Sequence, residues 1–265
     1  QRAQQALQQT GWIGWSSSGQ VLTFEQLFPA FTPNTIQQHV IDEADSLNPP
    51  ALAILEAPTG IGKTETALYL ADRWIQAAGG RGIYVAMPTQ ATSNQMFDRV
   101  RDFLAGRYPE GMVNLQLLHS QAQWTETLQS MTLSTMGENE EARVAALGWF
   151  LPRKRGLLAP FAVGTVDQAL VSILLTKHFF VRLFGLGHKV VIFDEVHAYD
   201  TYMSTLFCRL LQWLRQLGAS VIVLSATLPS KVRQELLEAY LGEPVELPKE
   251  QYPTLTVATP ATVRS

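Results

Sequence analysis

Short apolar runs alternate with longer amphipathic stretches along most of the chain. This alternation is typical of βα units arranged around a largely parallel sheet. The runs lack polar alternation, as expected of strands that are covered on both faces. We therefore predict strands at residues 52–56, 83–87, 115–118, 161–163, 190–193 and 221–224.

The stretches between these runs have helical spacing. We predict helices at residues 64–77, 93–104, 166–175 and 203–217, and a shorter helix from 230 to about 241. Within 203–217, leucines recur at steps of three and four residues and form one apolar face. The pattern as a whole predicts an α/β fold, with a mostly parallel central sheet flanked by helices.

The two ends of the chain lack this pattern. Residues 1–30 are rich in glutamine and then in turn-forming residues, and they include Trp12 and Trp15. We expect an N-terminal arm or linker from a missing upstream domain, its tryptophans packed on the body rather than stacked on bases. Residues 248–265 carry three prolines and little periodicity. We expect them to be a linker toward a further missing domain.

Composition narrows the class of protein. Apolar residues make up 46% of the 265 residues and charged residues only 16%, so the chain can bury a large core and is not a disordered polymer. The net charge of −3 gives no bulk basic field, so any nucleic acid must be bound by local groups. A single cysteine, Cys208, excludes an internal disulfide framework and a cysteine zinc site, and fits the reducing cytoplasm. Because no apolar run reaches the ~18 residues of a membrane span, we expect no membrane partner.

A glycine-rich segment, APTGIGKT at residues 57–64, joins the first predicted strand to a helix. This is the context of a nucleotide phosphate loop. The glycines let successive backbone N–H groups point at phosphate oxygens, beside the positive end of the new helix. Lys63 would reach the β- and γ-phosphates, and the Thr64 hydroxyl would bind Mg²⁺. The predicted phosphate-binding residues are Thr59, Gly60, Ile61, Gly62, Lys63 and Thr64.

Two acids, Asp194 and Glu195, follow the apolar strand at 190–193. They would lie at the carboxyl edge of the sheet, where ligands bind in such folds. Asp194 would hold Mg²⁺, usually through water, and Glu195 would polarise the water that attacks the γ-phosphate, so we predict Glu195, Asp194 and Lys63 to be catalytic. Alone, the pair would read as a solvated acidic turn, but the phosphate loop in the same chain favours the catalytic interpretation.

Several motifs follow one another in a characteristic order. They are GKT at 62–64, PTQ at 88–90, GT at 164–165, DEVH at 194–197 and SAT at 225–227. This series resembles the first motor domain of superfamily 2 helicases. FTP at 31–33 with Gln37, VGTVDQ at 163–168 and DEVHAYD at 194–200 are similar, more narrowly, to the helicase–nuclease of type I CRISPR systems. The resemblance implies a RecA-like P-loop domain over residues 31–247, which binds ATP and Mg²⁺ and drives single-stranded DNA translocation in CRISPR interference.

The resemblance also implies roles at matching positions. Gln37 matches the glutamine that reads adenine. From the residues themselves, we expect the Ser225 and Thr227 hydroxyls after the last strand, and His197 beside the acids, to couple nucleotide state to the rest of the protein, although a packed histidine and a helix-starting turn are the plainer interpretations. The residues that match contacts to the single-strand backbone are Thr89, Gln90, Gly164, Thr165 and Asp167. The implied partners are single-stranded DNA, a CRISPR RNA-guided surveillance complex, and the second RecA-like domain and nuclease domain of the same parent protein.

Two parts of the resembled enzyme do not occur in this sequence. No histidine is followed by aspartate, so the His-Asp pair of the nuclease is missing, and no arginine-rich motif of a second motor domain follows residue 230. We therefore expect the isolated chain to be nearly inactive as an ATP hydrolase. Two other functions stay open: an RNA helicase motor, because the motifs are shared, and a non-catalytic ATP-dependent interaction module. The basic run at 153–155 and the His119-Ser120 pair stay open between strand contact and an ordinary loop or strand end.

Overall fold

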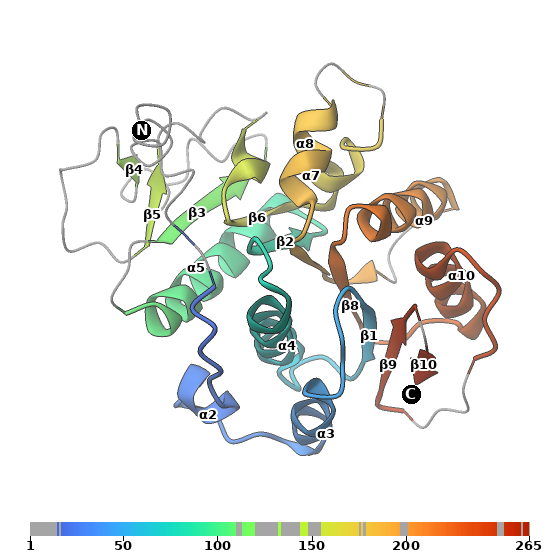
Figure 1. Cartoon of the computed structure of the whole chain (residues 1–265), viewed down its shortest axis with the longest axis horizontal. Coiled ribbons are helices and arrows are strands. Elements are labelled where there is room, and N and C mark those ends of the chain that lie inside the picture. The colour runs from blue at the N-terminus through green and yellow to red at the C-terminus, as the bar shows by residue number, and fades with distance from the viewer. Residues whose placement is uncertain are drawn as a thin grey trace.

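The computed structural model describes residues 15, 17–109, 113–119, 132–133, 144–147, 155–174, 176, 179–196, 201–247, 252–260 and 262–264. Within these residues the strands form one sheet in the order β10-β9-β1-β8-β7-β2-β6-β3-β5-β4 (Figure 1). The strands are β1 Leu52–Glu56, β2 Ile83–Met87, β3 Val113–Leu118, β4 Thr132–Leu133, β5 Val144–Leu147, β6 Phe161–Thr165, β7 Val190–Phe193, β8 Ser220–Ser225, β9 Thr254–Thr259 and β10 Thr262–Arg264.

The centre of the sheet, from β1 to β3, is parallel throughout. Every residue of these six strands is buried, which explains why their sequences lack polar alternation. All six strands were predicted from the apolar runs, and three have the expected bounds. The predicted α/β fold with a mostly parallel central sheet is therefore confirmed.

Helices cover both faces of the sheet. They are α2 Phe24–Leu27, α3 Thr35–Ala44, α4 Lys63–Ala78, α5 Gln90–Arg107, α7 Val166–Leu170, α8 Phe179–Leu186, α9 Thr201–Gln216 and α10 Ser230–Leu241, with a 3₁₀ turn at Gly156–Leu158. In Figure 1, α4 and α5 lie below the sheet and α7, α8 and α9 above it. Among the described residues, none of these helices is long and apolar enough to cross a membrane.

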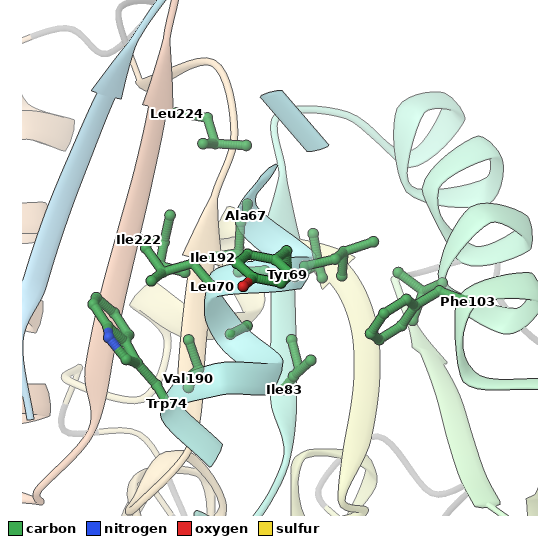
Figure 2. Packing of buried hydrophobic residues seen from close by; sticks show 14 of the residues in the cluster. Ala67, Tyr69, Leu70, Trp74, Ile83, Phe103, Val190, Ile192, Ile222 and Leu224 are labelled. Atoms are coloured by element: carbon green, nitrogen blue, oxygen red, sulfur yellow. The ribbon is translucent and has the colours of Figure 1, made fainter. Parts of the chain in front are cut away.

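Alternate strand residues feed two separate cores. Ala53 and Leu55 of β1 pack with α4 and α5, whereas Leu52 and Ile54 pack with α9 and α10. Figure 2 shows the first core, in which the fully buried Trp74 of α4 lies against the strands. Both faces of the sheet are thus sealed by apolar side chains, and polar chemistry is left to the strand ends.

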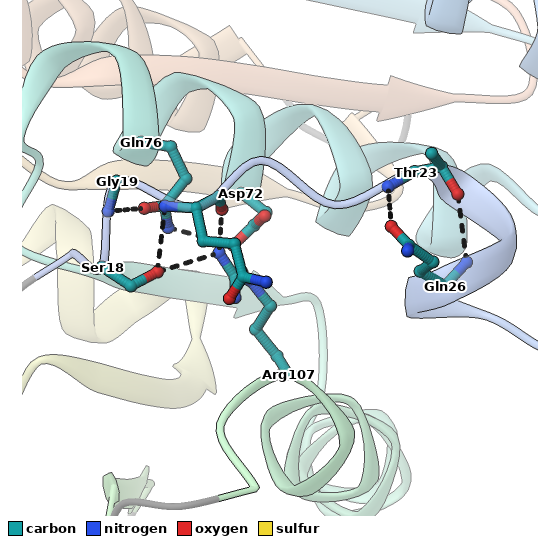
Figure 3. Close-up of polar contacts among 8 residues, drawn as sticks. Ser18, Gly19, Thr23, Gln26, Asp72, Gln76 and Arg107 are labelled. Atoms are coloured by element: carbon teal, nitrogen blue, oxygen red, sulfur yellow. Dashed lines mark hydrogen bonds and ion pairs between the residues drawn. The ribbon is translucent and has the colours of Figure 1, made fainter.

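The N-terminal segment is more firmly built in than an arm or linker. Gly19 donates to Gln76 Oε1 of α4 at 2.8 Å (Figure 3). The Arg107 guanidinium of α5 donates to the Gln20 carbonyl at 2.6 Å. Trp15 meets the Phe161 ring edge-on with centroids 4.8 Å apart, so it packs on the body as expected. The prediction that residues 1–30 lie outside the core is wrong for α2, because Phe24 and Leu27 are buried in the first core. Trp12 lies outside the described residues.

The C-terminal segment also departs from the prediction. Thr254–Thr259 forms β9, which pairs antiparallel with β1 over five residues, and β10 pairs with β9. Five of the six β9 positions are buried, so the expectation of an irregular linker over residues 248–265 is wrong there. Threonine supplies much of this strand, and its β-branched side chain suits a pleated surface without adding apolar character to the sequence.

Candidate nucleotide-binding site

A pocket of about 750 Å³ opens at the carboxyl edge of the sheet, where β1, β7 and β8 end side by side. It collects the residues that the sequence predicted for nucleotide binding and hydrolysis. Its lining consists of Phe31, Thr32, Asn34, Gln37, Thr59, Gly60, Ile61, Gly62, Lys63, Thr64, Glu65, Arg99, Asp194, Glu195, Ser225 and Ala226. The structure therefore brings the phosphate loop and the acidic pair, which are 130 positions apart at Thr64 and Asp194, to one cavity.

The phosphate loop takes its shape from two glycines. Gly60 and Gly62 have φ angles of 83° and 82°, a left-handed conformation that side chains with a Cβ rarely adopt. Gly62 is the N-cap of α4, and Lys63 is the first residue of that helix. The Lys63 ammonium lies inside the loop and donates to the carbonyls of Ala57 at 2.5 Å and Pro58 at 3.1 Å. The loop thus presents a helix N-terminus and a cation to the same cavity, which is the arrangement that binds phosphates.

Two opposing effects act on the Lys63 ammonium. Burial lowers the pKa of Lys63, while the negative charges of Asp194 and Glu195 raise it. The two acids are therefore close enough to Lys63 to interact electrostatically, as a shared site requires. The balance leaves the pKa lowered from its ordinary value of 10.5.

Gln37 supports the phosphate loop through a hydrogen bond to its backbone. It forms a reciprocal capping box with Asn34 at the start of α3, and its Nε2 also donates to the Gly62 carbonyl at 3.2 Å. Asn34 Nδ2 donates to the Ile61 carbonyl at 2.8 Å. Gln37 is buried, and both ends of its amide already have partners within the chain. The structure thus shows a bracing role at this position, and the reading of adenine stays a prediction.

Asp194 and Glu195 directly follow β7, and Glu195 has an unusual backbone conformation. Asp194 N donates to the Ala86 carbonyl at 3.0 Å and so extends the ladder between β7 and β2. Glu195 has a φ of 55°, and its backbone N–H donates to Asp194 Oδ1 at 2.9 Å. Burial raises the pKa of Asp194, while that hydrogen bond and the cations Lys63 and Arg99 lower it. Of the two adjacent acids, Asp194 is partly buried and Glu195 is exposed.

The donor set suits a magnesium ion that also binds phosphates. Thr64 and Asp194 both line the pocket, and Asp194 Oδ1 accepts a hydrogen bond from the Glu195 backbone N–H. Protein-bound Mg²⁺ commonly takes one or two carboxylates and completes its shell with phosphate oxygens and waters. In the described part of the chain, no cluster of three or more histidine, cysteine or acidic side chains could hold a metal without such help.

The segment after β8 is tied to the phosphate loop. Ala57 N donates to the Ser225 carbonyl at 3.2 Å, and Ser225 Oγ donates to the Thr227 carbonyl at 2.9 Å. Ser225 is buried and lines the pocket, whereas Thr227 is exposed and outside it. The coupling role of both residues stays a prediction. The remaining coupling residue, His197, lies outside the described residues.

A buried acid that the sequence analysis missed supports this connection. Glu56, the last residue of β1, accepts a hydrogen bond from Leu228 N at 2.7 Å and pairs with Arg233 Nε of α10 at 2.6 Å. The side chains of Glu56 and Arg233 are only 3% and 10% exposed. A charged residue that ends an otherwise apolar strand, directly before a phosphate loop, was the signal in the sequence.

The predicted strand-contacting residues lie along the neighbouring part of the same edge. Thr89 and Gln90 follow β2 and are exposed, and Thr89 is the N-cap of α5, accepting from Thr92 N at 3.1 Å. Asp167 is exposed in the first turn of α7. These three positions are available to a nucleic acid, and their contact with it stays a prediction.

Gly164 and Thr165 have a different environment from those three. Both are buried in β6, and the Thr165 carbonyl accepts from the Tyr84 hydroxyl at 2.9 Å. A Cβ at Gly164 would lie 2.4 Å from the Leu118 carbonyl oxygen, so packing alone requires glycine there. Their strand contact therefore rests on the resemblance alone.

The structure describes some of the other residues that the sequence analysis singled out. His119, directly after β3, is buried and its Nε2 lies 2.8 Å from Asn94 Oδ1 of α5. Burial also lowers the pKa of His119. Cys208 packs against the second core, as expected from its apolar surroundings. Ser120 and the basic residues 153 and 154 lie outside the described residues.

With this geometry in place, comparison with known proteins decides the family. A family model described as DEAD/DEAH box helicase matches residues 34–236, which is most of the chain. The chain belongs to the DEAD/DEAH box helicase family. The matched range contains the phosphate loop, the acidic pair and the candidate strand-contacting residues of this helicase domain.

Individual relatives confirm the narrower resemblance. The helicase domain is 47% identical over 250 residues to the CRISPR-associated endonuclease/helicase Cas3 of Thermus thermophilus, a match that covers 92% of this chain and 27% of that protein. The crystal structure of T. fusca Cas3-ADP matches with a TM-score of 0.85 at 36% identity, over 99% of this chain and 30% of that one, which confirms the RecA-like fold. A chain of a pre-nicking CRISPR RNA-guided surveillance complex matches with a TM-score of 0.64 at 33% identity, over 88% of this chain and 24% of that one. The helicase domain thus spans less than a third of the length of these relatives.

Proposed function

We propose that this chain is the first motor lobe of an ATP-driven single-stranded DNA translocase that acts in CRISPR interference. The observation that carries the proposal is the shared pocket, in which Lys63 and Thr64 of the phosphate loop face Asp194 and Glu195. The similarity to Cas3 proteins, one of them crystallised with ADP, supports ATP as the nucleotide and CRISPR interference as the process.

The predicted nucleotide-binding and catalytic residues each have a defined task in this proposal. The backbone amides of residues 59–62 and the N-terminus of α4 hold the phosphates, and Lys63 neutralises the charge that grows on the β- and γ-phosphates. Thr64 and Asp194 would hold Mg²⁺, which when bound supplies further charge neutralisation. Glu195, exposed at the mouth, orients the attacking water and takes its proton. Gln37 keeps Gly62 in place and, as the resemblance implies, recognises adenine.

Strand binding and assembly complete the proposal. Thr89, Gln90 and Asp167 offer a hydroxyl, an amide and a helix start at the edge next to the pocket, groups that suit contacts to a single-strand backbone without reading its sequence. A second RecA-like lobe and a nuclease domain of the parent protein would supply the remaining functions, and a surveillance complex would recruit the whole. The similarity to Cas3 proteins also supports action in the cytoplasm.

The isolated lobe should bind nucleotide weakly and turn it over poorly. The arginines that stabilise the transition state in such motors come from the second lobe, and an arginine of this kind is worth ~10³–10⁵ in turnover. Translocation also needs two lobes that close on ATP and reopen after hydrolysis. A chain with the nucleotide site alone therefore lacks both the final cation and the mechanical partner.

Glu195→Gln in the full-length parent tests the proposal. The variant should bind ATP as tightly as the wild type, while strand-stimulated ATP hydrolysis falls by ~10²–10⁴, because the amide cannot accept the proton. Glu235→Gln is the matched control, since Glu235 lies on α10 in an exposed pair with Lys231. A parent without ATPase activity on single-stranded DNA would contradict the motor proposal. Stimulation by RNA alone would indicate an RNA helicase, and full function in Glu195→Gln an interaction module.

A further inference from the structure

An ion pair between Glu65 and Arg99 forms part of the wall of the nucleotide pocket. Glu65 lies in the first turn of α4, and its Oε1 is 2.5 Å from Arg99 Nη2 of α5. Both side chains line the pocket, and they are 15% and 48% exposed respectively. The pair therefore joins the helix that begins at the phosphate loop to the helix that begins at the predicted strand contacts.

The negative charge of Glu65 is unfavourable for phosphate binding at the neighbouring loop. Glu65 Oε2 would lie 3.5 Å from a Cβ built at Gly62, so its carboxylate borders the loop itself. A carboxylate in the first turn favours the helix, because it faces the positive end of the dipole. The same charge repels a triphosphate that would use that helix end. Glu65 thus needs a cation if the loop is to bind phosphate well.

Arg99 is placed to supply that cation. Among the residues that the structure describes, the charged side chains that line the pocket are the cations Lys63 and Arg99 and the acids Glu65, Asp194 and Glu195. Without Arg99, these three carboxylates would face a single ammonium. A neutral residue at 99 would therefore weaken phosphate binding at this site.

We infer that Arg99 is a positioning residue of the nucleotide site, which neutralises Glu65 and holds its carboxylate away from the bound phosphates. The inference rests on the proposed function, since it assigns the pair to the ATP site. Arg99 acts through Glu65 rather than on the nucleotide. The need for Arg99 should consequently disappear when Glu65 carries no charge.

The test is the affinity of this 265-residue chain for a non-hydrolysable ATP analogue with Mg²⁺, measured by titration calorimetry. Arg99→Ala should weaken binding by about tenfold or more, because an unpaired carboxylate then faces the phosphates. Adding Glu65→Gln to Arg99→Ala should return the affinity to within about threefold of the wild type. Arg101→Ala is the matched control, because Arg101 lies on the same helix and pairs with Asp98 and Asp102 away from the pocket. Thermal unfolding of each variant verifies that it is folded.

The outcomes separate the inference from the function on which it rests. Wild-type affinity in Arg99→Ala, or no recovery in the double variant, overturns the inference while leaving the nucleotide site intact. In the second case Arg99 would contact the nucleotide directly. Binding by the wild type that Lys63→Ala abolishes supports the proposed function independently of Arg99. A wild-type chain that binds no analogue at all overturns the proposed function and the inference together.

Discussion

Arg107 is the residue whose loss should most clearly reveal how the N-terminal segment is held. Its Nε lies 2.8 Å from Asp72 Oδ1, and each side chain is only 2% exposed (Figure 3). The same guanidinium donates to the Gln20 carbonyl at 2.6 Å. One side chain of α5 therefore joins α4 to the segment that precedes α2.

The cost of Arg107→Leu follows from what it leaves behind. Truncating one partner of a buried ion pair costs roughly 3–5 kcal/mol, mostly because the other charge is stranded. The lost bond to Gln20 adds about 1 kcal/mol. Against a typical stability of about 5–15 kcal/mol for a domain, the free energy of unfolding should fall by a large fraction. Adding Asp72→Asn should recover much of the loss, because no charge then remains buried.

The variant should also acquire a characteristic dependence on pH. Burial already raises the pKa of Asp72, and Arg107 opposes that effect. Without Arg107 the pKa rises further, so the folded state takes up a proton at a higher pH than the unfolded chain. The deficit of Arg107→Leu should therefore be full near pH 8 and shrink as the pH falls toward 5.

Urea unfolding of wild type and variants at pH 5 and pH 8 measures these differences. Arg101→Leu, on the exposed side of the same helix, should cost less than about 1 kcal/mol. Limited proteolysis should cut the N-terminal segment faster in Arg107→Leu than in Arg101→Leu. A loss below about 1 kcal/mol in Arg107→Leu, or one that neither Asp72→Asn nor lower pH relieves, would refute the reasoning.

Three further outcomes are expected. Burial lowers the pKa of Lys189 to about 7, so the folded state binds this proton less tightly than the unfolded chain. The free energy of unfolding should therefore rise by up to about 1.4 kcal/mol per pH unit from pH 7 toward 10. Urea unfolding of Lys189→Met should not show this dependence on pH. Gly164→Ala should lower the free energy of unfolding by about 1–3 kcal/mol, because its Cβ would meet the Leu118 carbonyl. Gly106→Ala, with open space around its Cβ, should instead stabilise α5 by up to about 1 kcal/mol. Equal effects of the two substitutions in chemical unfolding would contradict the packing argument. Thr89→Ala in the parent should weaken single-stranded DNA binding in a mobility-shift assay without changing nucleotide affinity, and unchanged strand affinity would remove this residue from the interface.

The central strands were predictable because burial on both faces leaves a plain apolar signature. The bounds of β1, β2 and β7 match the apolar runs residue for residue. β9 pairs with β1, the outer strand of the parallel core, and half of its six residues are threonines. Threonine favours strands as valine does but is not apolar, so β9 does not appear in the sequence as an apolar run. Helix α2 was missed for another reason: with four residues it is too short to show a helical period, and its capping box at Thr23 and Gln26 is its main local signal.

The pocket was predictable to a similar degree, and for a topological reason. In a parallel sheet the carboxyl ends meet at one edge, so motifs directly after β1, β7 and β8 had to converge wherever those strands were neighbours. The partners of the residues that brace the site were beyond reach. Asn34, Glu56 and Arg99 contact residues 27, 172 and 34 positions away, and nothing in their immediate sequence specifies those partners.

The same edge explains how the predicted nucleotide site and the predicted strand contacts can lie side by side in one small lobe. β2 lies between β7, which ends in the acidic pair, and β6, which ends at Gly164 and Thr165. The ladder does not stop at the end of β7, because Asp194 N still donates to the Ala86 carbonyl of β2 at 3.0 Å. Thr89 caps α5 only three residues beyond Ala86, so one short, hydrogen-bonded stretch of backbone links the predicted metal ligand to the predicted strand contact. A displacement of either end should therefore be felt at the other without a long relay of side chains.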